Sequence, residues 1–285
     1  MPKLEMPEHS FSQKLLLALV VIIGVFPVLY FLSVEIGIAE SIAQTADTTH
    51  TGDPTFDRFV ENIAFGVGEK LDFDINYGFI NAGTASMEVA RVIDYEDRPC
   101  YQIVTRANSN SFFSTWYRVD DRVESIVDAL GLFSWRFEKH LREGNYSADK
   151  VYTFNQKRNF AVYEDDTLPV APQIQDALST LYYVRTMPLT VGKSTFVDTF
   201  VDGKSIRLEV RVIKKETVSV EAGTFDCIVV EPITQSVGVF KHEGRLTVWL
   251  TDDYVRMPVL MKSKILVGSI SAELTDFQLG EIWDF

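Results

Sequence analysis

The chain has few of the residues that build metal sites. Among its 285 residues are only two cysteines, Cys100 and Cys227, and four histidines, which lie scattered at positions 9, 50, 140 and 242. A zinc site takes four ligands, usually from closely spaced Cys and His pairs. Neither Cys-x-x-Cys nor His-Glu-x-x-His occurs. The sequence therefore predicts no metal centre and no cofactor.

Positive charge is also scarce. The 27 Lys and Arg residues face 40 Asp and Glu residues, which gives a formal net charge of -13 at pH 7. Such a chain is repelled by the phosphates of nucleic acids and by anionic lipid surfaces. We therefore expect no nucleic-acid partner, and membrane contact only through the N-terminal segment. An acidic surface also keeps a protein soluble, which is the simpler interpretation.

The usual catalytic motifs are missing. Residues 66–69 (Gly-Val-Gly-Glu) lack the third glycine of a dinucleotide fingerprint, so we expect a turn there. Residues 268–271 (Gly-Ser-Ile-Ser) are not the Gly-x-Ser-x-Gly of a nucleophile elbow. Adjacent carboxylates occur at 120–121, 165–166 and 252–253. Neighbours on a strand point to opposite faces and those in a turn face water, so no converging acid–base pair is indicated and we predict no enzyme.

An unbroken apolar run at residues 15–32 follows a short start that carries two lysines, and acidic residues come after it. This charge order is typical of an N-terminus held in the cytoplasm with the rest exported. Two alternatives are open. A signal peptide could be cleaved after Ala39 or Ala43, or an uncleaved anchor could span the bilayer with its 18 apolar residues. Both place residues 44–285 outside the cytoplasm.

One stretch after residue 68 differs from its surroundings by showing helical periodicity. Apolar residues recur at three- and four-residue steps, at Ile174, Ala177, Leu178, Leu181 and Val184. Prolines precede and follow the stretch, so we predict one amphipathic helix at about residues 173–186. We expect its face with Ile174, Leu178 and Leu181 to pack on the β-structure.

Nearly everything else after residue 68 alternates at the two-residue step of strands. The predicted strands lie at 71–77, 85–89, 101–105, 112–127 (one or two), 132–142, 150–155, 159–163, 195–201, 205–213, 217–221, 224–231, 246–251, 259–267 and 270–278. Asp202-Gly203 is a strong hairpin signal, because both turn positions need positive φ. Short consecutive strands with tight turns predict a mostly β fold of antiparallel meanders, as a curved sheet, a sandwich or an open barrel.

These patterns divide the chain into three parts. We predict a leader at 1–43, a linker at 44–64 with a short helix at 56–63, and a single β-rich domain at 65–280 of two lobes, 65–170 and 190–280, joined by the helix.

Several segments resemble the family known as domain of unknown function 3108. They lie at 176–185 (Asp-Ala-Leu-Ser-Thr-Leu-Tyr-Tyr-Val-Arg), 221–227, 248–253, 256–259 and 267–270, with a similar opening at 65–69 and 78–85. Their order matches that of the family over about residues 65–280. The resemblance implies an exported β-rich protein of the bacterial cell envelope, on the periplasmic side, which is soluble after cleavage or anchored in the inner membrane by residues 15–32. It supplies no activity and no catalytic residues.

Aromatic residues cluster on neighbouring predicted strands of the first half, with arginines among them. A curved sheet lined with aromatic side chains can enclose a cavity, and an arginine at its mouth can hold an acidic head group. We take Trp116, Arg118, Arg122, Trp135, Tyr182 and Trp249 as candidate ligand-binding residues. The simpler alternative is an aromatic core with arginines on the outer face. Alternation places Trp116 and Arg118 on one surface.

The two cysteines leave two alternatives. Cys100 and Cys227 could form a disulfide between the two lobes, since an exported compartment permits one. They could equally be buried free thiols that act as small apolar side chains.

Three hypotheses for function follow. The first is a non-catalytic envelope protein that binds a lipid-like or amphipathic ligand. The second is a structural or assembly partner of another envelope protein, through a sheet edge or an aromatic patch. The third, which the sequence favours least, is a hydrolase of an envelope polymer.

Overall fold

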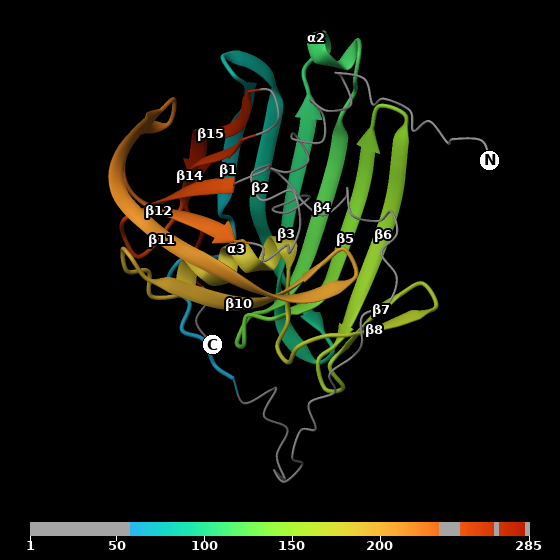
Figure 1. The fold of residues 1–285 in the computed structure, drawn as a ribbon. Helices are drawn as coiled ribbons and strands as arrows, with labels where there is room; N and C mark the ends of the chain where they lie inside the picture. The colour runs from blue at the N-terminus through green and yellow to red at the C-terminus, as the bar shows by residue number, and fades with distance from the viewer. Residues whose placement is uncertain (1–57, 234–245, 265–267, 283–285) are drawn as a thin grey trace, which may run out of the picture.

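A computed structural model describes residues 58–233, 246–264 and 268–282 of the chain (Figure 1). The expected leader and most of the expected linker lie outside these residues. The short helix expected at 56–63 is not formed over residues 58–63. The Val60 amide instead donates to the Leu130 carbonyl at 2.9 Å, and the Asn62 side chain accepts from the amide of Ala64. Backbone donors that a helix needs are thus used elsewhere.

The described part of the chain is mostly strand, as predicted. Its elements are β1 (Lys70–Tyr77), β2 (Ile80–Tyr95), β3 (Arg98–Ser109), α2 (Ser111–Ser114), β4 (Asp120–Asp128), β5 (Ser134–Glu143), β6 (Tyr146–Asn155), β7 (Phe160–Tyr163), β8 (Asp166–Pro169), β9 (Gln175–Asp176), α3 (Ala177–Thr186), β10 (Ser194–Val201), β11 (Lys204–Val220), β12 (Gly223–Ile233), β13 (Leu246–Thr251), β14 (Pro258–Lys264) and β15 (Ser269–Gln278).

All fifteen described strands belong to one sheet. Their order is β8-β7-β6-β5-β4-β3-β2-β1-β15-β14-β13-β12-β11-β10-β9, so two meanders meet where the first strand pairs with the last. The register there runs from Lys70 opposite Gln278 to Tyr77 opposite Ile270. Every pairing is antiparallel except that of β9 with β10. The halves predicted as two lobes therefore share a continuous sheet.

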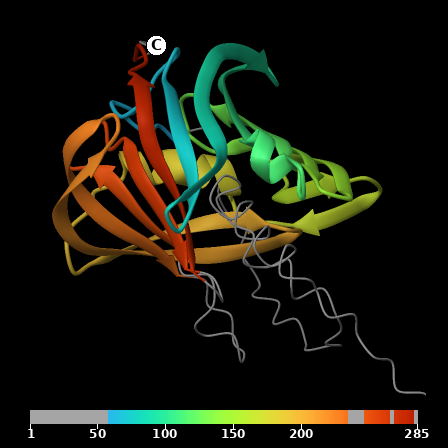
Figure 2. The same cartoon turned by 90° about the horizontal axis from the view of Figure 1, so that it is seen from above.

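The sheet curves around helix α3 (Figure 2). Its two ends approach each other, because the Ala171 amide beyond β8 donates to the Ser205 hydroxyl of β11 at 3.1 Å. The β11–β12 hairpin bends back as well, and the Ala222 amide at its tip donates to the Leu274 carbonyl of β15 at 3.1 Å. The result is an open, barrel-like sheet with the helix on its concave side.

Helix α3 begins later than the sequence predicts. Residues 175–176 pair in parallel with β10, which holds their backbone extended, and Asp176 then caps the helix. The Asp176 carboxylate accepts from the amides of Leu178 and Ser179, both at 2.8 Å. Ile174 therefore lies before the helix, but it is buried together with Leu178 and Leu181, as expected for side chains that pack on the sheet.

The strand expected across 112–127 begins only at Asp120. Asn110 caps α2, because its side-chain oxygen accepts from the Phe113 amide at 2.9 Å, so the chain turns before the strand starts. Aromatic residues predicted to lie on a strand, Phe112 and Trp116 among them, lie instead on this helix and the turn that follows it. The Asp202-Gly203 hairpin is confirmed, with φ of 44° and 83° at its two turn residues.

Candidate functional site

The six residues predicted to bind a ligand lie in separate parts of the molecule. Trp116 and Arg118 follow α2 at one end of the sheet. Arg122 is paired with Glu124 on β4. The other three lie apart from these and from one another. Trp135 lies in a buried cluster with Cys100, and Tyr182 lies on α3. Trp249 lies on β13, and its indole donates to the Glu216 carboxylate at 2.6 Å. Only Trp116 and Arg118 are brought together.

Four large apolar side chains stand exposed where the β1–β2 turn lies beside α2. Phe79 is fully exposed, and Ile80, Phe112 and Trp116 keep 56%, 60% and 66% of their surface. These four residues are termed the apolar rim. Few monomeric proteins leave large apolar side chains clustered in water without a use for them.

The loops that carry the apolar rim are held in place by Asn110. Its side-chain nitrogen donates to the Asn81 carbonyl at 2.8 Å, and its amide donates to the Ala82 carbonyl at 2.9 Å. The rings of Phe112 and Trp116 meet edge to face at 4.7 Å. The backbone of the two loops is thus joined and Phe112 and Trp116 pack on each other, whereas the fully exposed Phe79 side chain extends into solvent.

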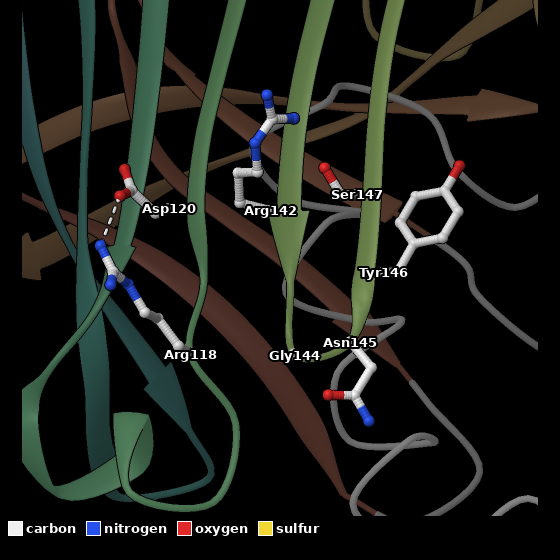
Figure 3. Close-up of a pocket in the computed structure, with 7 residues that line it drawn as sticks. All are labelled: Arg118, Asp120, Arg142, Gly144, Asn145, Tyr146 and Ser147. Carbon is white, nitrogen blue, oxygen red and sulfur yellow. Dashed lines mark hydrogen bonds and ion pairs between the residues drawn. The ribbon is translucent and has the colours of Figure 1, made fainter.

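A polar hollow lies beside the rim, at the ends of β4, β5 and β6 (Figure 3). Its volume is about 380 Å³, and its lining residues are Arg118, Asp120, Arg142, Gly144, Asn145, Tyr146 and Ser147. Each arginine already has a carboxylate partner. Arg118 donates to Asp120 at 2.8 Å, and Arg142 donates to both oxygens of Asp149 at 2.9 Å. The charges in the hollow therefore cancel, and it offers a polar but nearly neutral surface.

Two carboxyl groups meet close to the hollow on neighbouring strands, Asp121 on β4 and Glu143 on β5. Burial raises the pKa of both groups, and the negative charge of Asp121 helps to raise that of Glu143 to about 8. Asp121 accepts from the Arg142 amide at 2.7 Å, so it holds the negative charge while Glu143 keeps a proton. The Tyr117 hydroxyl donates to the Glu143 carbonyl at 2.8 Å, which joins this pair to the loop of the rim.

A buried ion pair lies in the middle of the domain. Arg185, at the end of α3, donates to the two oxygens of Glu69 at 2.7 Å and 2.6 Å, and both side chains are buried. Its other contacts are the carbonyls of Ala64 at 3.0 Å and Val255 at 3.2 Å. The Tyr182 ring lies 5.1 Å from the guanidinium. Good geometry and additional hydrogen bonds are what a buried ion pair requires.

Both cysteines are buried free thiols in this structure. Cys100 lies in a small cluster with Phe133 and Trp135, whereas Cys227 belongs to the main core. The pairing considered from the sequence is therefore not formed. Burial raises the pKa of the Cys227 thiol to about 11 and that of Cys100 further above its ordinary value, so neither is an activated nucleophile.

Residues 58–233, 246–264 and 268–282 hold no group of three or more His, Cys, Asp or Glu side chains placed to bind a metal ion. None of the helices described has the length and apolar character needed to cross a membrane.

The family described as protein of unknown function DUF3108 has a sequence model that matches residues 72–275. The chain belongs to this family. No relative is found among functionally curated proteins.

Solved structures show what the DUF3108 fold is similar to. A β-barrel-like protein of domain of unknown function DUF1849 from Brucella abortus matches with a TM-score of 0.51 and 11% identity, over 76% of this chain and 100% of its own. A hypothetical protein from Chlamydia trachomatis (TM-score 0.35, 6% identity, 77% and 93% covered) and a DUF1089 family protein from Pseudomonas aeruginosa (0.35, 12%, 75% and 95%) are more distant. Of these three, only the Brucella structure has a TM-score above 0.5, and it supports the barrel-like fold.

Three segments that resemble DUF3108 in the sequence converge on Arg185. Glu69 comes from the opening segment, Arg185 ends the helical segment, and Arg256 begins a third. Arg256 donates to the Arg185 carbonyl at 2.8 Å and also to that of Met187. Residues that carry the family resemblance thus form a packing centre.

Sequence reasoning missed most of the apolar rim and the acid pair. Phe79 and Ile80 lie at a turn. The available signal in the sequence was a pair of large apolar residues directly after Gly78. Glu143 meets Asp121 only through the register of β4 and β5, which the sequence of either strand does not specify.

Proposed function

We propose that this DUF3108 protein is a non-catalytic binding protein of the bacterial cell envelope, which holds a lipid-like or amphipathic molecule against its apolar rim. The order of charges around residues 15–32 supports export. The observation that carries the proposal is the exposure of Phe79 and Trp116, on two loops joined through Asn110, next to a polar hollow. The apolar part of an amphipathic molecule would lie on the rim, and its polar part would lie in the hollow.

The concave side of the sheet is a less suitable site, because helix α3 occupies it. Leu178 and Tyr182 on the helix are 2% and 1% exposed, and Tyr182 meets the Phe65 ring edge to face at 4.9 Å. Side chains from the sheet pack against the helix and fill the rest of the concave side. A ligand would have to displace core packing there, whereas the rim is open to it.

Crosslinking in cells tests this function on the full chain. We would replace Trp116 or Phe79 by the photoreactive benzoylphenylalanine, irradiate intact cells, and identify adducts by mass spectrometry. The matched control is Tyr254, which is equally exposed at 66% but lies in the β13–β14 turn at the other end of the sheet.

We expect adducts with lipid-sized masses at positions 116 and 79, at least tenfold above those at position 254. Equal labelling at all three positions would show that the rim has no special role. A protein adduct at the rim without lipid would overturn the proposal in favour of an assembly role.

A further inference from the structure

We infer that the apolar rim docks on the surface of a lipid bilayer, with its side chains at the boundary between headgroups and acyl chains. The inference rests on the proposed function and identifies the amphipathic partner as a membrane surface. It also revises the expectation, drawn from net charge alone, that membrane contact is confined to the N-terminal segment.

The chemistry of the rim fits that boundary. Tryptophan anchors proteins at the interface, where one end of its ring is apolar and the other wet, and phenylalanine adds apolar surface that enters the acyl boundary. Phe79, in the β1–β2 turn, is the most exposed of the four. Arg118 follows Trp116 by two residues and keeps 72% of its side chain exposed, so its guanidinium, paired with Asp120, remains accessible to a phosphate headgroup.

Local charge does not oppose docking on a zwitterionic surface. The net charge of -13 belongs to the whole chain, whereas the hollow next to the rim has two arginines balanced by Asp120 and Asp149. Docking would therefore come from apolar burial, and salt would change it little.

The size of the rim favours a fluid surface over a protein partner. Three exposed aromatic rings and one isoleucine offer roughly 600 Å² of surface, at ~150–250 Å² for each ring. A stable protein interface needs about 800 Å² from each partner, on surfaces of matching shape. Side chains on two loop tips can insert among lipids without such a match.

The chain before residue 58 is long enough to bring the rim to the bilayer that residues 15–32 would occupy. Val60 bonds to Leu130 in the β4–β5 turn, at the end of the sheet away from the rim. The 25 residues from 33 to 57 extend to about 80–90 Å at most. Strand β2, with 16 residues, measures only about 53 Å along the sheet. The tether therefore permits both contacts, and an anchor in the bilayer would keep the rim close to its surface.

Depth-dependent quenching tests the docking with the full chain reconstituted in phosphatidylcholine vesicles that contain brominated acyl chains. Tryptophan fluorescence of the wild type is compared with that of Trp116→Phe, which keeps an apolar ring at the rim. A second variant, Trp116→Phe with Tyr254→Trp, moves the indole to the opposite end of the sheet.

We expect bromine near the headgroups to quench the Trp116 contribution at least twofold, with no such loss for the indole at position 254, and the same result in high salt. Equal quenching in the wild type and in Trp116→Phe would overturn the docking. If lipid crosslinks to position 116 in cells while Trp116 stays unquenched in vesicles, the proposed function stands and the bilayer inference fails.

Discussion

Arg185 and Glu69, 116 residues apart in the chain, hold each other through two hydrogen bonds in the interior of the domain. Arg185→Met should lower the free energy of unfolding by about 3–5 kcal/mol, because it leaves the Glu69 carboxylate buried without its partner. Urea unfolding measures the loss. Arg211→Met, which breaks an exposed pair with Glu209, is the control and should leave stability unchanged.

The same ion pair predicts how a second substitution behaves. Arg185→Met combined with Glu69→Leu removes both charges, so it should recover more than half of the stability lost in the single variant. A double variant less stable than Arg185→Met would mean that the bonds from Arg185 to the backbone, and not the unpaired charge, dominate.

Helix α3 is largely buried, so truncating one of its core side chains should destabilise the domain. Leu178→Ala should cost about 2–5 kcal/mol, from lost apolar burial and the cavity left behind. Val191→Ala, at a side chain that is 45% exposed just after the helix, provides the comparison and should change stability little. Equal unfolding midpoints for the two variants in urea would contradict the organising role of the helix.

The shared proton of Asp121 and Glu143 should make stability depend on pH. The folded protein keeps the Glu143 proton up to its pKa of about 8, whereas the unfolded chain releases it near the ordinary value of 4.5. Between these values the folded state binds more protons, so the contribution of this pair to stability is full below about pH 4.5 and is lost as the pH rises to about 8. The slope is at most about 1.4 kcal/mol per pH unit.

Glu143→Gln isolates this contribution from other titrating groups. Urea unfolding of the wild type and the variant between pH 5 and pH 8.5 should show a steeper decline for the wild type. Parallel curves for the two proteins would show that no proton is retained at this pair.

The two buried free thiols predict how the protein responds to a thiol reagent and to a reducing agent. Cys100 and Cys227 are buried with raised pKa values, so an aromatic disulfide reagent should react with neither in the folded protein and with both in urea. The melting temperature should be the same with and without a reducing agent. If unreduced protein shows no reactive thiol in urea, the two cysteines are joined.

Local signals in the sequence predicted much of the fold. The alternation of Leu71, Phe73 and Ile75 with polar residues predicted β1, and each of these apolar side chains is buried. Asp202-Gly203 predicted its hairpin because two consecutive positive φ angles suit few other residue pairs. Such features depend only on residues close together in the chain, so a single sequence is enough to predict them.

Features that depend on distant residues were not predictable in this way. No local signal specifies that β1 pairs with β15. Residues 112–114 also do not show that Asn110 will cap a helix there while its side-chain nitrogen donates to Asn81. The late start of α3 has the same origin, since Asp176 is fixed by Ser134 from β5 at 2.5 Å. Of the residues predicted to bind a ligand, Trp116 belongs to the rim and Arg118 lines the hollow, while Trp135 and Tyr182 lie in the interior.

The pairing of β1 with β15 also joins two ends of the domain that are far apart in the chain. Lys70 finds its partner only when Gln278 has been made, and contacts between such distant residues form slowly. Until then the edge of β1 stays open, and an unpaired strand edge readily joins another chain. A newly made molecule is therefore most at risk of aggregation along the line that later becomes the middle of its sheet, and a chain cut short before β15 keeps that risk permanently.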